Sequence, residues 1–300
     1  MAPEQQPVTV GIARGDSIHD AVAQAVGLAG GLGFIKPGQT VLVKPNVNSA
    51  DPCPGTTNPQ VLYEVVRLVW ERDPKRVIVG DRSWYRATTR ECMKKTGIYD
   101  AANEARAEVV YFEDGPWRRV RPEGAKHWGK GFSVTGFLSV PDHIITLPVL
   151  KTHRLATFTM ALKNSVGFIP PEERLETLHS QSHAEPRFGS LIAEINLAVN
   201  ISFVIMDGTR AFVSGGPSTG EVAEPGLMVA TSDRIANDAV GLAILKVLGS
   251  TPAIMEKSVW EQPQLKRAVE LGLGVKGAAE IDLKGHRVPE LDRIRQQLEG

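Results

Sequence analysis

The chain has 300 residues, of which 42% are apolar and 23% are charged, values typical of a globular protein with a sizeable core. Lysine and arginine together number 34, as do aspartate and glutamate, so no overall charge attracts nucleic acid or an acidic membrane. The two cysteines, Cys53 and Cys92, are too few for an iron–sulfur cluster of the chain's own or for a disulfide framework, which indicates a reducing compartment.

At the N-terminus, residues 1–8 contain no apolar run, so we expect no signal peptide. No later stretch approaches the roughly 18 consecutive apolar residues that a membrane span needs. From these two observations we expect a cytoplasmic protein without a membrane partner.

Short apolar runs then alternate with longer amphipathic stretches, a pattern typical of parallel βαβ units. We expect strands at residues 8–13, 38–45, 76–81, 108–112, 143–153, 202–208 and 226–233. We expect the helices between them at residues 17–30, 58–72, 89–96, 188–199 and 235–248.

Two regions depart from this alternation. Residues 113–140 are richer in Arg, Lys, Trp and Gly and predict a hairpin-like excursion, and residues 251–300 predict a peripheral C-terminal subregion with a helix at 264–271 and a strand at 280–283. The whole of 1–300 is therefore predicted to be a single α/β domain. Its mostly parallel, doubly wound sheet has helices on both faces and a small C-terminal α+β subregion.

Four of the expected strands end in polar residues. These residues are Lys44 and Asn46 after the second strand, Asp81 after the third, Lys151 and His153 after the fifth, and Asp207 after the sixth. Parallel strands bring their carboxyl ends to one edge of the sheet, where ligands bind in open α/β folds. The pattern predicts that these side chains share one cleft.

Lysines dominate this set. Lys44 and Lys151 each continue a buried strand, and Lys163 follows with Asn164 in the motif "ALKNSVG". Three ammonium groups near helix N-termini would bind a carboxylate or a phosphate. The alternatives are ordinary surface lysines, or ion pairs that hold loops in place without any ligand.

Two loops are further candidates for substrate binding. Thr56 and Thr57 precede a helix, where they either cap it or donate to an anion as well. Gly215 and Gly216, in "SGGPSTG", could surround an anion with backbone N–H groups, although the segment lacks the lysine and the spacing of a P-loop.

The catalytic candidates are His153, Lys151, Asp207 and Asp81. Histidine near neutral pH serves as an acid or base or as a metal ligand, and aspartate serves in either role too. A divalent metal is an open alternative, and its candidate ligands are His153, His179, His183 and Asp207. The last two histidines are four residues apart, but no zincin-type glutamate accompanies them.

Set in order, these motifs resemble domain-of-unknown-function family 362. The resemblance rests on "VLVKPNVN", "GTTNP", "VIVGD", "LPVLKTH", "TMALKNSVGFIP", "VIMDG", "GGPSTG" and "SDRIANDAVG", which lie within residues 40–245. It implies a shared α/β fold and a site at Lys44, Asn46, Thr57, Asp81, Lys151, His153, Lys163, Asn164, Asp207 and Asp238. It implies no settled reaction. Some members are similar to iron–sulfur proteins in an added cysteine-rich segment that this chain lacks, so electron transfer would require a redox partner.

The leading hypothesis is an enzyme that acts on a small anionic substrate, bearing carboxylate or phosphate, by acid–base or metal-assisted chemistry of these lysine, histidine and aspartate residues. The alternative is a non-catalytic metal- or cofactor-binding protein, or a maturation protein, that works with a redox partner. No G-x-G-x-x-G or G-x-S-x-G motif is present, which argues against a Rossmann dinucleotide site and a serine-hydrolase elbow. The cofactor, if any, is unknown, and an oligomer stays open.

Overall fold

A computed structural model describes residues 6–181 and 186–300 of the chain. Its strands are β1 (Val8–Ala13), β2 (Thr40–Pro45), β3 (Arg76–Asp81), β4 (Glu108–Tyr111), β5 (Trp117–Val120), β6 (Phe132–Thr135), β7 (His143–Leu147), β8 (Val149–His153), β9 (Thr157–Thr159), β10 (Phe203–Gly215), β11 (Gly220–Ala223), β12 (Leu227–Thr231) and β13 (Ile281–His286). Its α-helices are α1 (Ile18–Leu28), α2 (Pro59–Trp70), α3 (Thr89–Lys95), α4 (Ile98–Glu104), α5 (Ala161–Asn164), α6 (Pro171–Glu173), α7 (Arg187–Ile195), α8 (Arg234–Leu248), α9 (Pro252–Met255), α10 (Pro263–Glu270) and α11 (Leu291–Glu299).

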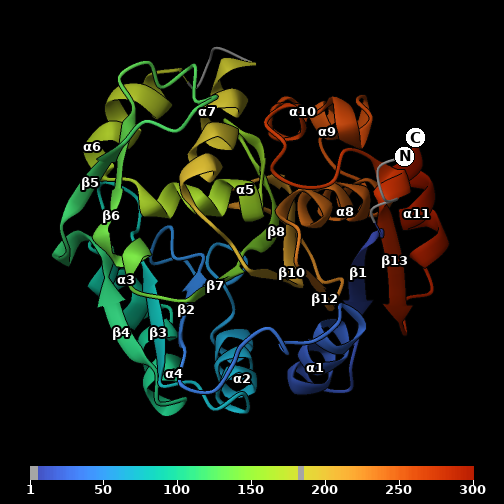
Figure 1. Cartoon of the computed structure of the whole chain (residues 1–300). Helices are drawn as coiled ribbons and strands as arrows, with labels where there is room; N and C mark the ends of the chain where they lie inside the picture. The colour runs from blue at the N-terminus through green and yellow to red at the C-terminus, as the bar shows by residue number, and fades with distance from the viewer. Residues whose placement is uncertain (1–5, 182–185) are drawn as a thin grey trace.

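One large sheet runs through the middle of the molecule, in the order β13-β1-β12-β10-β7-β2-β3-β4 (Figure 1). Strands β8 and β11 join it beside β10, and β9 pairs with β8. The pairs β1–β13, β7–β10, β2–β7, β2–β3 and β3–β4 are parallel, as is β8–β10. The predicted mostly parallel α/β fold is confirmed.

Strand β12 is the exception, because it lies antiparallel between β1 and β10. The chain leaves β10, turns back as β11 and enters β12 through a short connection. Such a connection is too short for the crossover that a parallel neighbour requires. The direction of a strand therefore follows from the connection before it, which apolar patterning alone does not reveal.

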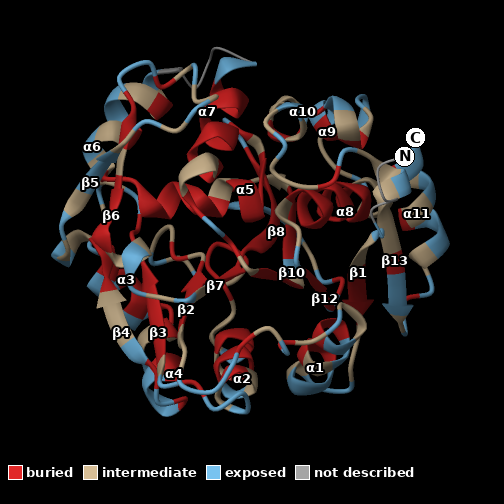
Figure 2. Cartoon of the chain, viewed as in Figure 1, coloured by how far each residue is buried: buried red, intermediate tan, exposed pale blue. Residues whose placement is uncertain are grey.

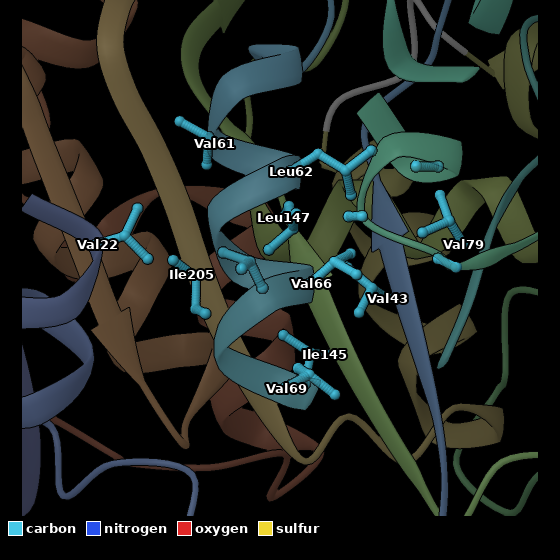
Figure 3. Packing of buried hydrophobic residues seen from close by; sticks show 14 of the residues in the cluster. Val22, Val43, Val61, Leu62, Val66, Val69, Val79, Ile145, Leu147 and Ile205 are labelled. Carbon is cyan, nitrogen blue, oxygen red and sulfur yellow. The ribbon is translucent and has the colours of Figure 1, made fainter. Parts of the chain in front are cut away.

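Helices cover both faces of the sheet, with α1, α2 and α4 below it and α5, α7 and α8 above it in Figure 1. Figure 2 shows that the buried residues gather along the sheet and on the inward sides of these helices. On the lower face, Val66 and Val69 of α2 pack near Val43 and Ile145 of the strands (Figure 3). Each such side chain contributes about 1.5–3 kcal/mol through burial.

Local signals fix the starts of the main helices. The side chain of Asn58 accepts a hydrogen bond from the N–H of Gln60, and Pro59 occupies the first turn of α2. Asp233 does the same at α8, where it accepts from the N–H groups of Ile235 and Ala236. These caps satisfy backbone donors that have no partner inside the helix.

The predicted strand at 143–153 is in fact two strands, β7 and β8, separated at Pro148. Proline has no N–H to donate, although the carbonyl of Pro148 accepts a hydrogen bond from the N–H of Asp207. The predicted strand at 202–208 is correspondingly longer, because β10 continues to Gly215 between β8 and β11. Asp207 thus lies within a strand and not after one.

The 113–140 excursion contains the antiparallel pair β5–β6, and Phe132 and Val134 of this hairpin pack with Leu191 of α7. The C-terminal segment, predicted to be a peripheral subregion, lies at one edge of the main sheet. Strand β13 extends the main sheet beside β1, and Leu283 and Ile294 join the core that α8 forms. Helices α4, α5, α6, α9 and α11 are additional to the predicted helices. Within residues 6–181 and 186–300, no helix has the length and apolar character to cross a membrane.

Candidate functional site

A small cavity of about 40 Å³ lies where β2, β3 and β8 end. Seven of the residues that the sequence singled out line it, namely Lys44, Asn46, Asp81, Lys151, His153, Lys163 and Asn164. Its volume is far below the roughly 300–1,000 Å³ of a drug-sized ligand pocket. The cavity therefore has the size of one small anionic group or a few waters.

Lys44 and Asp81 form a buried ion pair, with Nζ 2.7 Å from Oδ1. They meet because β2 and β3 are adjacent parallel strands that end side by side. Nζ of Lys44 also donates to Oδ1 of Asn164 at 3.0 Å, and Asp81 accepts from the N–H groups of Val47 and Arg82. Burial lowers the pKa of Lys44, and the charge of Asp81 opposes this effect.

The backbone at Gly167 covers this ion pair. A Cβ at this position would lie 2.3 Å from Oδ1 of Asp81 and 2.7 Å from Nζ of Lys44. A residue with a side chain therefore could not place its backbone this close to the ion pair. The glycine in the motif "ALKNSVG" is explained by this approach.

Lys163 lines the cavity from α5 and is partly buried. No residue in the described part of the chain forms a hydrogen bond or ion pair with its ammonium group. Burial and the nearby charge of Arg174 lower the pKa of Lys163 to about 8. A partly buried cation without a counter-ion is unfavourable unless a ligand supplies the negative charge.

Lys151 is fully buried and is held by backbone carbonyl groups. Its Nζ donates to the carbonyl oxygen of Gly55 at 2.6 Å and to that of Pro217 at 3.4 Å. No carboxylate among the described residues forms an ion pair with it. Burial, followed by the charge of Lys163, lowers the pKa of Lys151 to about 7. This lysine can therefore gain and lose a proton near neutral pH.

Two arginines that the sequence analysis did not identify also line the cavity. The guanidinium of Arg174 donates only to backbone carbonyl oxygens, including those of Gly167 at 3.1 Å and Ser83 at 2.9 Å. Burial lowers its pKa to about 9. Arg82, which directly follows Asp81, donates to the carbonyl of Ser83 at 2.9 Å. Its position after a strand end was a usable signal, whereas Arg174 lies in a π-helical turn far along the chain.

The charge of the cavity is strongly positive. Its described lining residues include five cationic side chains, Lys44, Arg82, Lys151, Lys163 and Arg174, and one carboxylate, Asp81. The whole chain has equal numbers of acidic and basic residues, so this imbalance is local. Such a cavity attracts anions and repels metal cations.

His153 is held in one protonation state by its loop. Its Nδ1 accepts from the N–H groups of Leu155 at 3.1 Å and Ala156 at 3.2 Å. Burial lowers the pKa of His153 well below its usual value, and the charges of Lys163 and Lys151 add to the effect. The ring is therefore neutral with its proton on Nε2, which makes it a hydrogen-bond donor. In this state Nε2 has no free lone pair to act as a base or to ligate a metal.

Asp207, predicted to be catalytic, does not line the cavity. Its carboxylate is fully buried and accepts from the N–H of Asn58 at 2.7 Å, and from the N–H and hydroxyl of Thr209 at 3.0 and 2.7 Å. Burial raises its pKa. These contacts hold the start of α2 against β10.

We expect Asp207→Asn to lower stability without affecting anion binding. The asparagine amide has one acceptor oxygen where the aspartate carboxylate has two. A charge-assisted hydrogen bond is therefore lost, at a cost of about 1–3 kcal/mol. Urea unfolding measures the stability, and thermal shifts with sulfate measure anion binding. If Asp207→Asn kept its stability but lost the thermal shift with sulfate, Asp207 would belong to the anion site.

Thr56 and Thr57 are also behind the cavity wall. The hydroxyl of Thr57 donates to the carbonyl of Leu147 and accepts from the N–H of Asn46, both at 2.8 Å. The hydroxyl of Thr56 donates to the carbonyl of Ser49. Each hydroxyl already donates its proton to a backbone carbonyl, so neither donates to an anion, and their effect on the site is to position the segment after β2.

Gly215 and Gly216 form a turn rather than an anion-binding loop. Their φ angles are 76° and 70°, in the left-handed region that favours glycine. A Cβ at Gly216 would lie 2.1 Å from the carbonyl oxygen of Thr152, and the N–H of Gly216 donates to Thr219. The turn thus packs against β8 and places Pro217, whose carbonyl contacts Lys151.

The described residues among the proposed metal ligands, His153, His179 and Asp207, do not form a metal site. No three His, Cys, Asp or Glu side chains in the described residues are grouped as a metal site would require. Burial and the charge of Lys163 lower the pKa of His179 to about 4, and its ring contacts Tyr85 and Phe188. His183 lies outside the described residues. The described side chains therefore do not fit a divalent metal.

Asp238, implied by the family resemblance, acts on the site through α5. Its carboxylate accepts from the N–H groups of Ala161 at 2.7 Å and Leu162 at 3.0 Å. Burial raises its pKa to about 7. It thereby fixes the first turn of the short helix whose next residues, Lys163 and Asn164, line the cavity.

Comparisons with known proteins agree with the motif order. The sequence model described as "Domain of unknown function (DUF362)" matches residues 41–243, a range that contains every candidate site residue. The "Thylakoid-associated protein sll1697" of Synechocystis sp. (strain ATCC 27184 / PCC 6803 / Kazusa) is 28% identical over 267 residues, covering 87% of this chain and 80% of that protein. The lactate racemase apoprotein from Thermoanaerobacterium thermosaccharolyticum aligns over 74% of this chain with 14% identity and a TM-score of 0.44. This chain covers 54% of that structure, about half its length.

Proposed function

The chain belongs to the family described as domain of unknown function DUF362, and on this premise we propose that it is an enzyme that binds a small anionic substrate and transfers a proton. The observation that carries the proposal is Lys163, which lines a cationic cavity and whose ammonium group has no partner among the described residues. Five cationic side chains line the cavity with one carboxylate, and although Arg82 also pairs with Glu113 at 3.8 Å, the excess of positive charge is costly in the absence of an anion. A carboxylate or phosphate of the substrate would complete it.

The proposal gives each cavity residue one task. Lys163 binds the anionic group, and Nε2–H of His153 donates a further hydrogen bond to it. Lys151 is the acid and base, because its pKa of about 7 lets it exchange a proton at physiological pH. The surrounding cations would stabilise negative charge that develops on the substrate as a proton leaves.

Proton transfer fits these residues better than metal-assisted chemistry. The cavity repels a divalent cation, His153 offers it no lone pair, and Asp207 is committed to backbone and hydroxyl donors. The predicted acid–base variant of the enzyme hypothesis is therefore the one that we retain.

Deuterium incorporation tests the proposal directly. The full chain is incubated in D₂O with small carboxylates and phosphate monoesters, and NMR follows the replacement of carbon-bound hydrogen by deuterium. We expect exchange with at least one compound, its loss in Lys151→Met, and its retention in Lys75→Met. Lys75 is an exposed lysine immediately before β3, at the opposite end of the strand from Asp81. Anion binding without any exchange or conversion would overturn the catalytic part of the proposal.

Anion binding should weaken as the pH rises. Lys151 and Lys163 have pKa values lowered to about 7 and about 8, so both are protonated at pH 6 and largely neutral at pH 9.5. A bound anion raises both pKa values, so the decline in anion affinity begins at a higher pH. We expect sulfate, whose own charge is constant over this range, to bind about tenfold or more weakly at pH 9.5 than at pH 6. Isothermal titration calorimetry gives the profile, and a flat profile would contradict the roles of both lysines.

The expected cytoplasmic location is a separate part of this proposal. The relative from Synechocystis is named as thylakoid-associated, so a peripheral association with a membrane is the competing possibility. Separation of membranes from the soluble extract, followed by immunodetection of the chain in each fraction, distinguishes the two.

A further inference from the structure

Lys151 differs from the other fully buried lysine of the cavity in having no carboxylate partner. Lys44 pairs with Asp81 at 2.7 Å, whereas no carboxylate among the described residues pairs with Lys151. The charge of the neighbouring Lys163 also opposes protonation of Lys151. A buried amine beside a second cation is favoured in its neutral form, and the neutral form is a nucleophile.

The contacts of the Lys151 amine fit this neutral form. Its Nζ donates to the carbonyl oxygens of Gly55 at 2.6 Å and Pro217 at 3.4 Å, and these two acceptors match the two N–H groups of a neutral amine. The lone pair on Nζ then accepts from no described residue and is left for another bond. Pro217 lines the cavity together with Lys151, so the tip of the lysine side chain lies at the cavity wall.

An anion bound by Lys163 would lie close to this amine, because both lysines line one cavity of about 40 Å³. So small a space admits an electrophilic carbon only next to the anionic group, as in a 2-oxo acid. The oxygen of such a carbonyl gains negative charge when an amine attacks the carbon, and the cations that line the cavity would stabilise that charge. The volume and the charge of the cavity therefore favour a 2-oxo acid over a larger or neutral carbonyl compound.

We propose that Lys151 forms a reversible imine with a small 2-oxo acid whose carboxylate is bound by Lys163. This inference rests on the proposed function and adds to it the class of substrate, and in this step the amine of Lys151 serves as a nucleophile and not as a base. The nitrogen lone pair attacks the carbonyl carbon and forms a C–N bond, while the π electrons of C=O move to the oxygen. Both N–H protons pass to that oxygen, which leaves as water, and a C=N bond remains. No oxidant or reductant is consumed.

Reductive trapping of the full chain with pyruvate tests the proposal. Cyanoborohydride reduces an imine to a stable secondary amine, and peptide mass mapping locates the labelled lysine. An ordinary solvated lysine, with a pKa of about 10.4, is almost entirely protonated at pH 7. The pKa of Lys151 is lowered to about 7, so we expect Lys151 to be labelled at least roughly tenfold faster than the exposed Lys75. Excess sulfate should slow the labelling of Lys151, because sulfate occupies the anion site.

Lys163→Met should slow the labelling of Lys151 by roughly tenfold or more, because the charge-assisted contact with the carboxylate is lost. Lys75→Met is the control and should leave that rate unchanged within about twofold. If sulfate binds the unaltered chain but the label is spread evenly over exposed lysines, or is found on Lys163 in place of Lys151, this inference alone is overturned. If sulfate does not bind and Lys151 is not labelled, the proposed function fails together with it.

Discussion

Replacement of Lys163 by methionine should weaken anion binding strongly and, at the same time, stabilise the protein without ligand. The ammonium group has no partner among the described residues, and burial and the charge of Arg174 lower its pKa to about 8. Removal of an uncompensated, partly buried charge is expected to raise the free energy of unfolding by about 1–3 kcal/mol. Loss of a charge-assisted contact is expected to weaken sulfate or phosphate binding roughly 10- to 100-fold.

This combination of effects separates a ligand site from a structural ion network. A lysine that held a loop in place would lower stability on replacement and leave anion affinity unchanged. Urea unfolding without added anions gives the stability, and calorimetry with sulfate gives the affinity. Lys75→Met is the matched control because it removes an exposed lysine at the other edge of the sheet. A destabilised Lys163→Met variant with normal sulfate affinity would refute the anion site.

The convergence of strand ends was predictable because it follows from sheet geometry. Lys44, Asp81 and Lys151 all lie at the ends of apolar runs, and adjacent parallel strands bring such ends together. The pairing of Lys44 with Asp81 needs no information beyond the order of these two strands. The parallel fold and this part of the cavity could therefore be inferred before any coordinates.

Asp207 shows where this reasoning fails. The motif "VIMDG" has the same form as "VIVGD", yet β10 continues past Asp207 because β8 and β11 pair with its second half. A polar residue after an apolar run can lie at the end of a strand or in its middle. Only the tertiary arrangement distinguishes the two cases. The carboxylate consequently faces the start of α2, and its donors come from Asn58 and Thr209.

The role of His153 was beyond sequence reasoning for a different reason. Spacing placed it beside Lys151, but its protonation state depends on two backbone N–H groups of the following loop. Arg174 was missed because it reaches the cavity from a separate π-helical turn and binds only carbonyl oxygens. No local pattern encodes either contact.

The largest effect on stability is expected from Asp81→Asn. Asp81 is the single carboxylate among the described residues that line the cavity, and it pairs with the fully buried ammonium of Lys44 at 2.7 Å. Removal of one partner of a buried ion pair costs about 3–5 kcal/mol, because the remaining charge is uncompensated. Gly167 packs directly on one side of the pair, so water cannot approach the pair from that side without displacing the backbone.

The double variant Lys44→Met, Asp81→Asn should recover much of this loss and unfold within about 2 kcal/mol of the unaltered chain, because no unpaired ammonium then remains. Sulfate should stabilise Asp81→Asn more than it stabilises the unaltered protein, since an added anion replaces the missing charge beside Lys44. Urea unfolding of the two single variants and the double variant, with and without sulfate, measures both effects. An Asp81→Asn protein within about 1 kcal/mol of the original stability would mean that the ion pair is solvated, and the low-dielectric cavity on which every lysine assignment depends would be lost.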